Sequence, residues 1–387
     1  MNDTQIAHLI AEEEARQREI INLIASENYV SSDVREALGS VFVNKYAEGY
    51  PGARYYGGNT VSDQLELLTQ ERARELFKLS SKEWSVNVQP LSGSPANVAV
   101  YLALVPLGEK IMGMSLDHGG HLTHGHAVSI TGKVWQQVPY GVRGDTEQLD
   151  YDDLLEIAKR EQPACIVAGY TAYPRIVDWK KFRKIADAVD AYLVVDMSHS
   201  AGLVAGGAYP SPFLYADVVT TTTHKTLRGP RSALIFSRSE LSKKIDKAVF
   251  PGLQGGPHLN QIAAVAVALH EASGSGFKKY AHEVVKNANT LAQVLQECGW
   301  RIISGGTDSH IVLIDTWLDG KGVSGSDASV LLEKEGIIVN KNTIPFDKRS
   351  PMDPSGIRLG TAAETTRGKT TKDFEQIARR IDAILKN

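Results

Sequence analysis

The chain has 387 residues, of which 42% are hydrophobic and 22% are charged, and its formal net charge is −3. This length favours two domains with sizeable cores, and the composition is that of an ordinary globular protein. The small net charge gives no electrostatic reason to expect nucleic acid or an acidic membrane surface as a partner. The two cysteines, Cys165 and Cys298, lack metal-binding spacing, so we expect free thiols in a reducing compartment.

The N-terminal segment reads as part of the folded protein and not as a targeting signal. Residues 1–20 are charged, without the basic and then apolar regions of a signal peptide. No uninterrupted apolar run approaches the roughly 18 residues that a membrane span needs. We therefore expect a cytoplasmic protein. Residues 4–24 predict an amphipathic helix, and a second helix follows with Ser31 or Ser32 as its N-cap.

Residues 44–60 have no usable hydrophobic period and hold four tyrosines together with several glycines and a proline. This composition predicts a loop. A loop so rich in aromatic side chains is more often functional than idle.

From about residue 61 to residue 250 the pattern alternates between strands and helices. The predicted strands are 85–90, 110–115, 165–170, 192–196, 217–222 and 233–237, and the clearest helices are 63–77, 151–161 and 179–190. This alternation indicates a mostly parallel, doubly wound sheet. A long helical stretch over 260–300 follows and contains the domain boundary. Strands at 301–305, 310–317, 336–342 and 356–361 and a closing helix at 372–386 then predict a smaller α+β domain.

Two strands of this sheet end in residues that suit pyridoxal phosphate. Segment 191–204 delivers Asp196 and His199 at its strand end, and segment 216–231 delivers His224 and Lys225. The carboxyl ends of strands in open α/β sheets are where ligands are held. A lysine can form a Schiff base with the cofactor aldehyde, and a carboxylate can keep its pyridine nitrogen protonated. The plainer alternatives are a strand-end cap for Asp196 and a solvated lysine for Lys225.

Three further features can be read in more than one way. Ser92, Gly93 and Ser94 open a helix, where they could bind a phosphate or only cap the helix. Arg358 lies in an apolar strand, where it could pair with an acid or receive a ligand carboxylate. Arg228 and Arg231 follow Lys225 and supply positive charge near it. The four histidines of segment 117–127 are His118, His121, His124 and His126.

For these histidines we considered zinc first. The segment has no nearby cysteine and no HExxH pattern, and its glycines indicate close approach of the backbone. We expect no metal site. We expect instead an imidazole stacked on a planar cofactor, with a hydrogen-bonded core histidine as the alternative.

One motif matches the dinucleotide-binding fingerprint in its glycine spacing only. Gly320, Gly322 and Gly325 have its spacing between a strand and a helix. The next strand ends in Asn340 and lacks the acid that a ribose would need. We interpret Ser324 or Ser326 as a helix cap and do not expect nucleotide binding.

Taken together, several motifs closely resemble the serine hydroxymethyltransferase family, in order and over nearly the whole chain. The motifs are LIASENY, NKYAEGYPGARYYGGN, HGGHLTHG, VVDMSHSAGL, TTTTHKTLRGPR, FPGLQGGP and VNKNTIP. The resemblance implies the aspartate-aminotransferase fold (fold type I), an α/β fold with a mostly parallel seven-stranded sheet between helices and a smaller C-terminal α+β domain. It implies an N-terminal arm over 1–55, a large domain over 56–271 and a small domain over 272–387. It also implies a homodimer with shared active sites, or a tetramer.

The implied reaction transfers the hydroxymethyl carbon of serine to tetrahydrofolate and yields glycine. Lys225 would carry pyridoxal phosphate as a Schiff base, and Asp196 would pair with the pyridine nitrogen. The other implied cofactor contacts are His121 stacked on the ring, His199 and Thr171 near the phenolic oxygen, and Gly93 and Ser94 at the phosphate with Tyr46 and Gly256 of the partner subunit. His224 would tune the reaction specificity.

The resemblance also assigns the substrate and folate contacts. Ser26, Arg358 and His199 would hold the substrate carboxylate, with Arg231 in the same substrate-binding set. Glu48 of the partner subunit would be the acid/base, and Tyr55 and Tyr56 would shape the substrate and folate pocket. The implied folate contacts are Leu116, Gly120, His121, Leu122, Asn342, Ser350, Pro351 and Met352.

The chain departs from the family pattern at Pro95, Met352 and Ala362. Two other functions fit parts of the pattern. A folate-independent aldolase acting on threonine or other β-hydroxy amino acids would share Lys225 and Asp196, but would not need Tyr55 and Tyr56. A catalytically silent binding protein on the same fold would need neither the lysine nor the aspartate.

Overall fold

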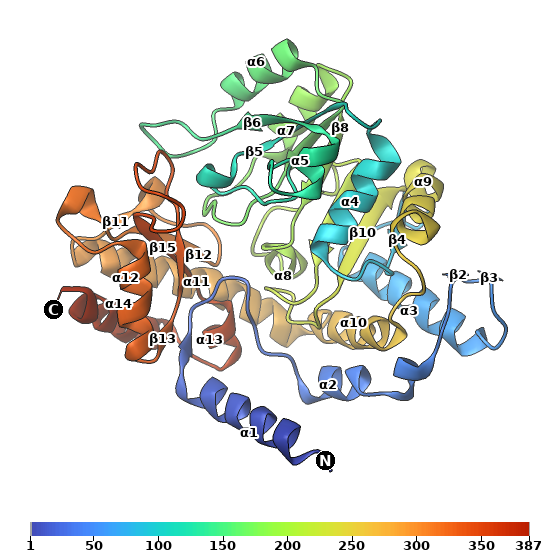
Figure 1. The fold of residues 1–387 in the computed structure, drawn as a ribbon, viewed down its shortest axis with the longest axis horizontal. Coiled ribbons are helices and arrows are strands. Elements are labelled where there is room, and N and C mark those ends of the chain that lie inside the picture. The colour runs from blue at the N-terminus through green and yellow to red at the C-terminus, as the bar shows by residue number, and fades with distance from the viewer. Residues whose placement is uncertain (1, 387) are drawn as a thin grey trace.

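The computed structural model describes residues 2–386, and within them a seven-stranded sheet forms the centre of a large α/β domain (Figure 1). Its strands, in spatial order, are β4 (Trp84–Asn87), β10 (Ala233–Arg238), β9 (Val218–Thr222), β8 (Tyr192–Asp196), β7 (Cys165–Ala168), β5 (Lys110–Met114) and β6 (Gln136–Tyr140). Only β10 runs antiparallel to its neighbours. Six of these strands are predicted by the sequence. The seventh, β6, was missed because its residues, QQVPY, show neither an apolar run nor a clean alternation.

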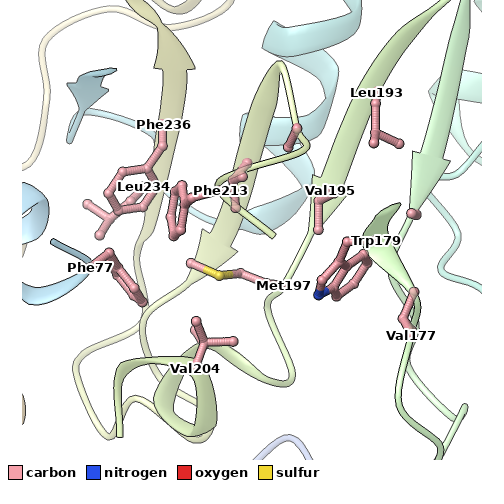
Figure 2. Close-up of a cluster of buried hydrophobic side chains, with 14 of the residues drawn as sticks. Phe77, Val177, Trp179, Leu193, Val195, Met197, Val204, Phe213, Leu234 and Phe236 are labelled. Carbon is pink, nitrogen blue, oxygen red and sulfur yellow. The ribbon is translucent and has the colours of Figure 1, made fainter. Parts of the chain in front are cut away.

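Helices cover both faces of this sheet, because successive strand residues point to opposite sides. Val194 packs in a core with α4 (Gly93–Leu104) and α9 (Ser242–Lys247). Its neighbours Leu193 and Val195 pack in the larger core on the other face, with Trp179 and Phe236 (Figure 2). The other helices of this domain are α3 (Thr60–Leu76), α5 (Ile130–Val134), α6 (Tyr151–Glu161), α7 (Trp179–Asp187), α8 (Ala201–Ala205) and α10 (Leu259–Ala272).

The predicted helical stretch over 260–300 is two helices, α10 and α11 (Ser275–Glu297). The break comes at Gly274, whose extended backbone makes it the N-cap of α11. The first half of α11 packs in the large core through Phe277 and Tyr280, and its second half packs in a separate core through residues such as Leu291. This helix therefore connects the two cores.

The second core belongs to a smaller domain, seen on the left of Figure 1. Among the described residues its antiparallel sheet has four strands in the order β11 (Arg301–Ile302), β12 (Ile311–Asp315), β15 (Gly356–Gly360) and β14 (Asn340–Asn342). The helices α12 (Gly325–Lys334), α13 (Ala362–Thr366) and α14 (Thr371–Lys386) accompany it. Ser324 caps α12 by accepting a hydrogen bond from the backbone of Asp327, as predicted.

The N-terminal segment packs on the smaller domain. β1 (Ile21–Asn22) pairs in parallel with β13 (Ile337–Ile338), and Leu23 is fully buried in the small core. The predicted helix over 4–24 is therefore too long, because α1 (Thr4–Glu19) ends where the chain becomes a strand. No residue of α1 is buried in this chain, and Leu9 is 58% exposed.

The remaining N-terminal elements are a short helix and the tyrosine-rich segment over 44–60. Ser31 caps α2 (Ser32–Leu38) as predicted. The segment predicted as a loop contains a short hairpin, β2 (Gly49–Tyr50) and β3 (Ala53–Arg54). Within residues 2–386, no helix combines the length and the apolar character needed to cross a membrane.

Candidate active site

One pocket lies at the carboxyl ends of the central strands. Asp196 ends β8, Lys225 follows β9, and Gly93 begins the helix that follows β4. All three line the same pocket, so the prediction that the carboxylate and the lysine meet there is confirmed. The full lining is Gly93, His121, His124, Tyr170, Thr171, Asp196, Ser198, His199, Thr222 and Lys225.

Asp196 is held as a carboxylate by several hydrogen bonds. Oδ1 accepts from the backbone N–H of Ser198 at 3.0 Å and from its hydroxyl at 2.5 Å. Oδ2 lies 2.9 Å from Asn97 Nδ2 and 3.3 Å from His124 Nε2. Burial by itself would raise the pKa of Asp196, but the contact with His124 and the nearby positive charges hold that pKa well below its ordinary value. The pocket therefore contains a permanent negative charge.

Asn97 is the central member of this polar network. Its Nδ2 also donates to Thr123 Oγ1 at 2.9 Å, and its Oδ1 accepts from Thr220 Oγ1 at 2.7 Å. Thr123 in turn lies 2.7 Å from Nδ1 of His121. The amide thus connects the Asp196 carboxylate to the loop that carries His121.

The ring of His121 belongs to the same pocket as Asp196 and Lys225. It lines the pocket, and its Nδ1 accepts from the backbone N–H of Thr123 at 3.2 Å. Burial, followed by the neighbouring His124, lowers the pKa of His121 to about 4, so the ring is neutral. No group of three or more His, Cys, Asp or Glu side chains within residues 2–386 is arranged to hold a metal ion.

Lys225 is buried, with 9% of the residue exposed, and the pKa of its amine is lowered. Burial, with the charges of Arg358 and Arg231, lowers the pKa of Lys225 to about 8, although Asp196 opposes this shift. The neighbouring His224 has a buried Nδ1 without a hydrogen-bond partner among the described residues, and burial lowers the pKa of its ring to about 3.

Arg358 resolves one of the alternatives left open by the sequence. It forms no salt bridge within residues 2–386; its Nε donates to Asn340 Oδ1 at 3.0 Å and its Nη1 to the Thr171 carbonyl at 2.6 Å. Burial lowers the pKa of Arg358 to about 10. Asn340, in the strand that follows the dinucleotide-like motif, therefore positions this arginine. A partly buried guanidinium without an acidic partner among these residues is suited to receive a carboxylate.

The tyrosine-rich hairpin lies outside the lining of this pocket. Tyr46 donates to Glu48 Oε1 at 3.0 Å and contacts the Tyr56 ring edge-on. A Cβ added at Gly256 would lie 3.4 Å from the Tyr46 ring. Tyr46, Tyr55 and Tyr56 are all more than half exposed. The structure therefore groups these predicted residues with one another and not with Lys225 of the same chain.

The remaining predicted residues fall outside the pocket lining as well. Ser94 and Arg231 are exposed, and Ser26 is partly buried next to Ala25. Gly120 could carry no side chain, because a Cβ there would lie 2.0 Å from the Met114 carbonyl oxygen. Of the predicted folate set, only His121 lines the pocket; the others are Leu116, Gly120, Leu122, Asn342, Ser350, Pro351 and Met352.

Sequence reasoning missed Asn97, Ser198 and His310. Asn97 could have been found, because it lies four residues after Gly93 on one helix face. Ser198 follows Asp196 by two residues, a spacing at which a side chain can bond the local backbone. Nothing in the local sequence indicates that His310, from the smaller domain, lies 3.2 Å from Nδ1 of His199.

The pocket fits pyridoxal phosphate by the chemistry of its side chains. The carboxylate of Asp196, the amine of Lys225 and the ring of His121 meet in one place. Gly93, at the start of α4, lets Thr222 pack closely, since a Cβ there would lie 2.8 Å from the Thr222 methyl group. The N-terminus of a helix of this length attracts phosphate.

Comparison with known proteins agrees with this geometry. A family model described as serine hydroxymethyltransferase matches residues 1–381. The protein is similar to the serine hydroxymethyltransferase of Desulfotalea psychrophila, with 54% identity over 100% of this chain and 89% of the relative. The same name and identity hold for a relative from Acidobacterium capsulatum, over 100% and 89% of the two chains. A relative from Koribacter versatilis is 55% identical over 97% of this chain and 87% of its own.

Proposed function

The chain belongs to the serine hydroxymethyltransferase family, and we propose that the Lys225 pocket is where it carries out that family's reaction. The enzyme transfers the hydroxymethyl carbon of serine reversibly to tetrahydrofolate, giving glycine and methylenetetrahydrofolate. The observation that carries the assignment is that Asp196 and Lys225 line one pocket at the carboxyl ends of β8 and β9.

Pyridoxal phosphate, when bound, supplies the electron sink that this carbon–carbon cleavage requires. Lys225 would hold it covalently, and a pKa of about 8 leaves part of the amine unprotonated near neutral pH. Asp196 would keep a negative charge at its pyridine nitrogen, and His121 would pack on its ring. Gly93 and Ser94 would hold its phosphate at the N-terminus of α4. Thr171 lines the same pocket, and Arg358 donates to its carbonyl.

The amino-acid substrate is held by its carboxylate. Arg358 offers the charge, since it has no acidic partner within residues 2–386. His199 and Ser26 add hydrogen-bond donors beside it. Arg231 contributes positive charge toward Lys225, and His224, next in sequence to the lysine, tunes which bond reacts.

The hairpin residues act in the site of a second copy of the chain. Glu48 is the acid/base at the substrate hydroxyl, and Tyr55 and Tyr56 shape the substrate and folate pocket. Tyr46 and Gly256 complete the phosphate site. Supporting this assignment, none of the five lines the Lys225 pocket of its own chain, and the tyrosines are exposed. Family members are oligomers, and a homodimer is the smallest assembly that completes both sites.

Folate binds at the mouth of the pocket. Its contacts are Leu116, Gly120, His121, Leu122, Asn342, Ser350, Pro351 and Met352. These residues come from the loop after β5, from the last residue of β14 and from the segment between β14 and β15. We place the domain boundaries at 1–55, 56–271 and 272–387, the last at the C-terminal end of α10.

A cytoplasmic location is part of the proposal. It is supported by the two cysteines, which are both free although Cys298 is only partly buried. Free thiols are typical of reducing compartments. Immunodetection in fractionated cells tests the location.

A serine-cleavage assay with and without tetrahydrofolate, on the wild type and on Lys225→Ala, tests the function. We expect folate-dependent cleavage by the wild type and none by the variant. The visible absorbance band of the bound cofactor should shift when glycine and folate are added together. Cleavage of β-hydroxy amino acids at a rate that does not depend on tetrahydrofolate would indicate an aldolase. The lack of any cofactor absorbance band would indicate a catalytically silent binding protein.

A further inference from the structure

His310 contacts two groups that surround the proposed carboxylate site. Its Nε2 lies 3.2 Å from His199 Nδ1 and 3.2 Å from the carbonyl oxygen of Ala25, the residue before Ser26. The His199 and His310 rings are nearly parallel, with 21° between their planes and 5.4 Å between their centres. His310 precedes β12 of the smaller domain, whereas His199 follows β8 of the larger one. One side chain thus joins both domains and the N-terminal segment.

These contacts determine where the ring protons lie. A carbonyl oxygen only accepts hydrogen bonds, so the contact with Ala25 requires a proton on Nε2 of His310. A protonated Nε2 of His310 cannot accept a hydrogen bond from His199, so its single N–H is shared between the Ala25 carbonyl and Nδ1 of His199. Nδ1 of His199 must therefore be the acceptor, which leaves the proton of a neutral His199 on its Nε2.

Burial keeps both rings neutral. His310 is 1% exposed and His199 is 7% exposed. Burial lowers the pKa of His310 to about 3 and, together with the charges of Lys225 and Arg358, lowers that of His199 well below its ordinary value. Lys225 and Arg358 disfavour a third cation near the pair, and the opposing Asp196 carboxylate, which lines a cavity with both rings, is already held by Asn97, His124 and Ser198. An imidazolium at either position is thereby excluded near neutral pH.

The result is a donor aimed at a ligand. His199 lines the pocket with Lys225, and its Nε2 makes no hydrogen bond among residues 2–386. Nδ1 of His310 is buried and also has no hydrogen-bond partner among these residues. A buried acceptor without a partner is less unusual than a buried donor without one.

We propose that His310 is a positioning residue that holds His199 in its Nε2–H tautomer, so that the pocket offers a neutral donor, beside Arg358, to the substrate carboxylate. The ligand part of this inference rests on the proposed function. The tautomer itself rests only on the contacts with Ala25 and His199.

Neutron diffraction from deuterium-exchanged crystals of the enzyme with its cofactor bound tests the tautomer directly. We expect deuterium on Nε2 of His199 and on Nε2 of His310. Deuterium on Nδ1 of His199 would overturn the proposal. This readout does not depend on any catalytic activity.

Two variants of His310 separate positioning from packing. In His310→Gln the side-chain amide can still donate to Ala25 and His199, whereas His310→Leu fills the space without a donor. We expect His310→Leu to weaken glycine binding by about tenfold, the effect of one hydrogen bond to a charged group, and His310→Gln to stay near the wild type. Glycine binding is read from the absorbance of the bound cofactor, with cofactor content and thermal midpoint measured for each variant.

Equal losses of glycine affinity in both variants would show a packing role only and would overturn the inference. If His199→Phe bound glycine as tightly as the wild type, the ligand part would be wrong whatever the neutron map showed. A wild-type enzyme that bound glycine but transferred no carbon to tetrahydrofolate would contradict the proposed function and not this inference.

Discussion

Asn97 donates a 2.9 Å hydrogen bond to the buried carboxylate of Asp196, ninety-nine residues further along the chain. The same amide donates to Thr123, beside His121. One side chain thus orders both the anion and the ring that the cofactor needs. Its position on α4, one turn after Gly93, also connects them to the proposed phosphate site.

Replacing Asn97 by alanine should weaken the binding of pyridoxal phosphate. Asp196 would lose a buried donor, and hydrogen bonds to charged groups contribute about 1.5–3 kcal/mol, so we expect roughly a tenfold or larger rise in the dissociation constant. Equilibrium dialysis of the apoenzyme measures it. Asn289→Ala, on the exposed face of α11, is the matched control and should bind normally. Equal affinities in the two variants would contradict the role of Asn97.

Asp196→Asn should remove most activity and leave the fold intact. The amide nearly preserves the shape of the carboxylate but carries no charge to keep the pyridine nitrogen protonated, so we expect kcat to fall by roughly 10²- to 10³-fold. Circular dichroism and the thermal midpoint check the fold. Asp217→Asn is the control. Asp217 precedes β9 and binds Arg183, so it lies at the opposite end of that strand from Lys225. It should lower stability and leave kcat nearly unchanged.

Capture of pyridoxal phosphate by the apoenzyme should depend on pH with a midpoint near 8. The free amine of Lys225 is the nucleophile, and its pKa is lowered from 10.5 to about 8. The capture rate should therefore rise about tenfold per pH unit below the midpoint and then level off. Stopped-flow absorbance measures this rate. A midpoint near the ordinary lysine pKa would show that burial does not activate the amine.

The same shift predicts a change in stability with a definite sign. Between pH 8 and the ordinary lysine pKa, the unfolded chain binds a proton that the folded apoenzyme has released. The contribution of Lys225 to the free energy of unfolding should therefore increase as pH rises through this window. Lys225→Met should remove this component when unfolding is followed at several pH values. An unchanged pH dependence would contradict the lowered pKa.

Arg54 should matter for both stability and catalysis. Its guanidinium pairs with the fully buried Glu66 at 2.6 Å and donates to the carbonyls of Ala47 and Gly49, on either side of Glu48. Arg54→Leu leaves the buried carboxylate of Glu66 with Gln89 as a hydrogen-bond donor but without its cation, which should cost about 3–5 kcal/mol and lower the thermal midpoint. Lys159→Leu, which removes an exposed ion pair with Glu156, should change stability by about 1 kcal/mol or less.

The double variant Arg54→Leu with Glu66→Leu separates the two effects. Replacing both partners of a buried ion pair by apolar groups is often neutral, so the thermal midpoint should recover. The carbonyls of Ala47 and Gly49 still lack the Arg54 donor, although Gln89 continues to donate to Gly49, and carbon transfer to folate should remain slow. Recovery of both properties together would show that Arg54 does not position Glu48.

The local pattern of the chain determined which segments become strands and helices, and where Asp196, Lys225 and Gly93 lie at their ends. Apolar alternation acts over a few residues, and parallel strands share one carboxyl edge, so the meeting of these three groups followed from the sequence. The same local reasoning predicted a helix longer than α1. It also missed the edge strand β6, because its glutamines and proline interrupt the apolar pattern of a strand.

The tertiary structure alone decided the contacts that give these groups their chemistry. The pairing of β1 with β13, the amide of Asn97 on Asp196 and the approach of His310 to His199 each join residues far apart in sequence. Such contacts depend on how two cores pack against a shared helix, and hydrophobic periodicity says nothing about which polar side chains then meet. The sequence therefore identified the reacting groups, and the packing of the two domains fixed their protons and partners.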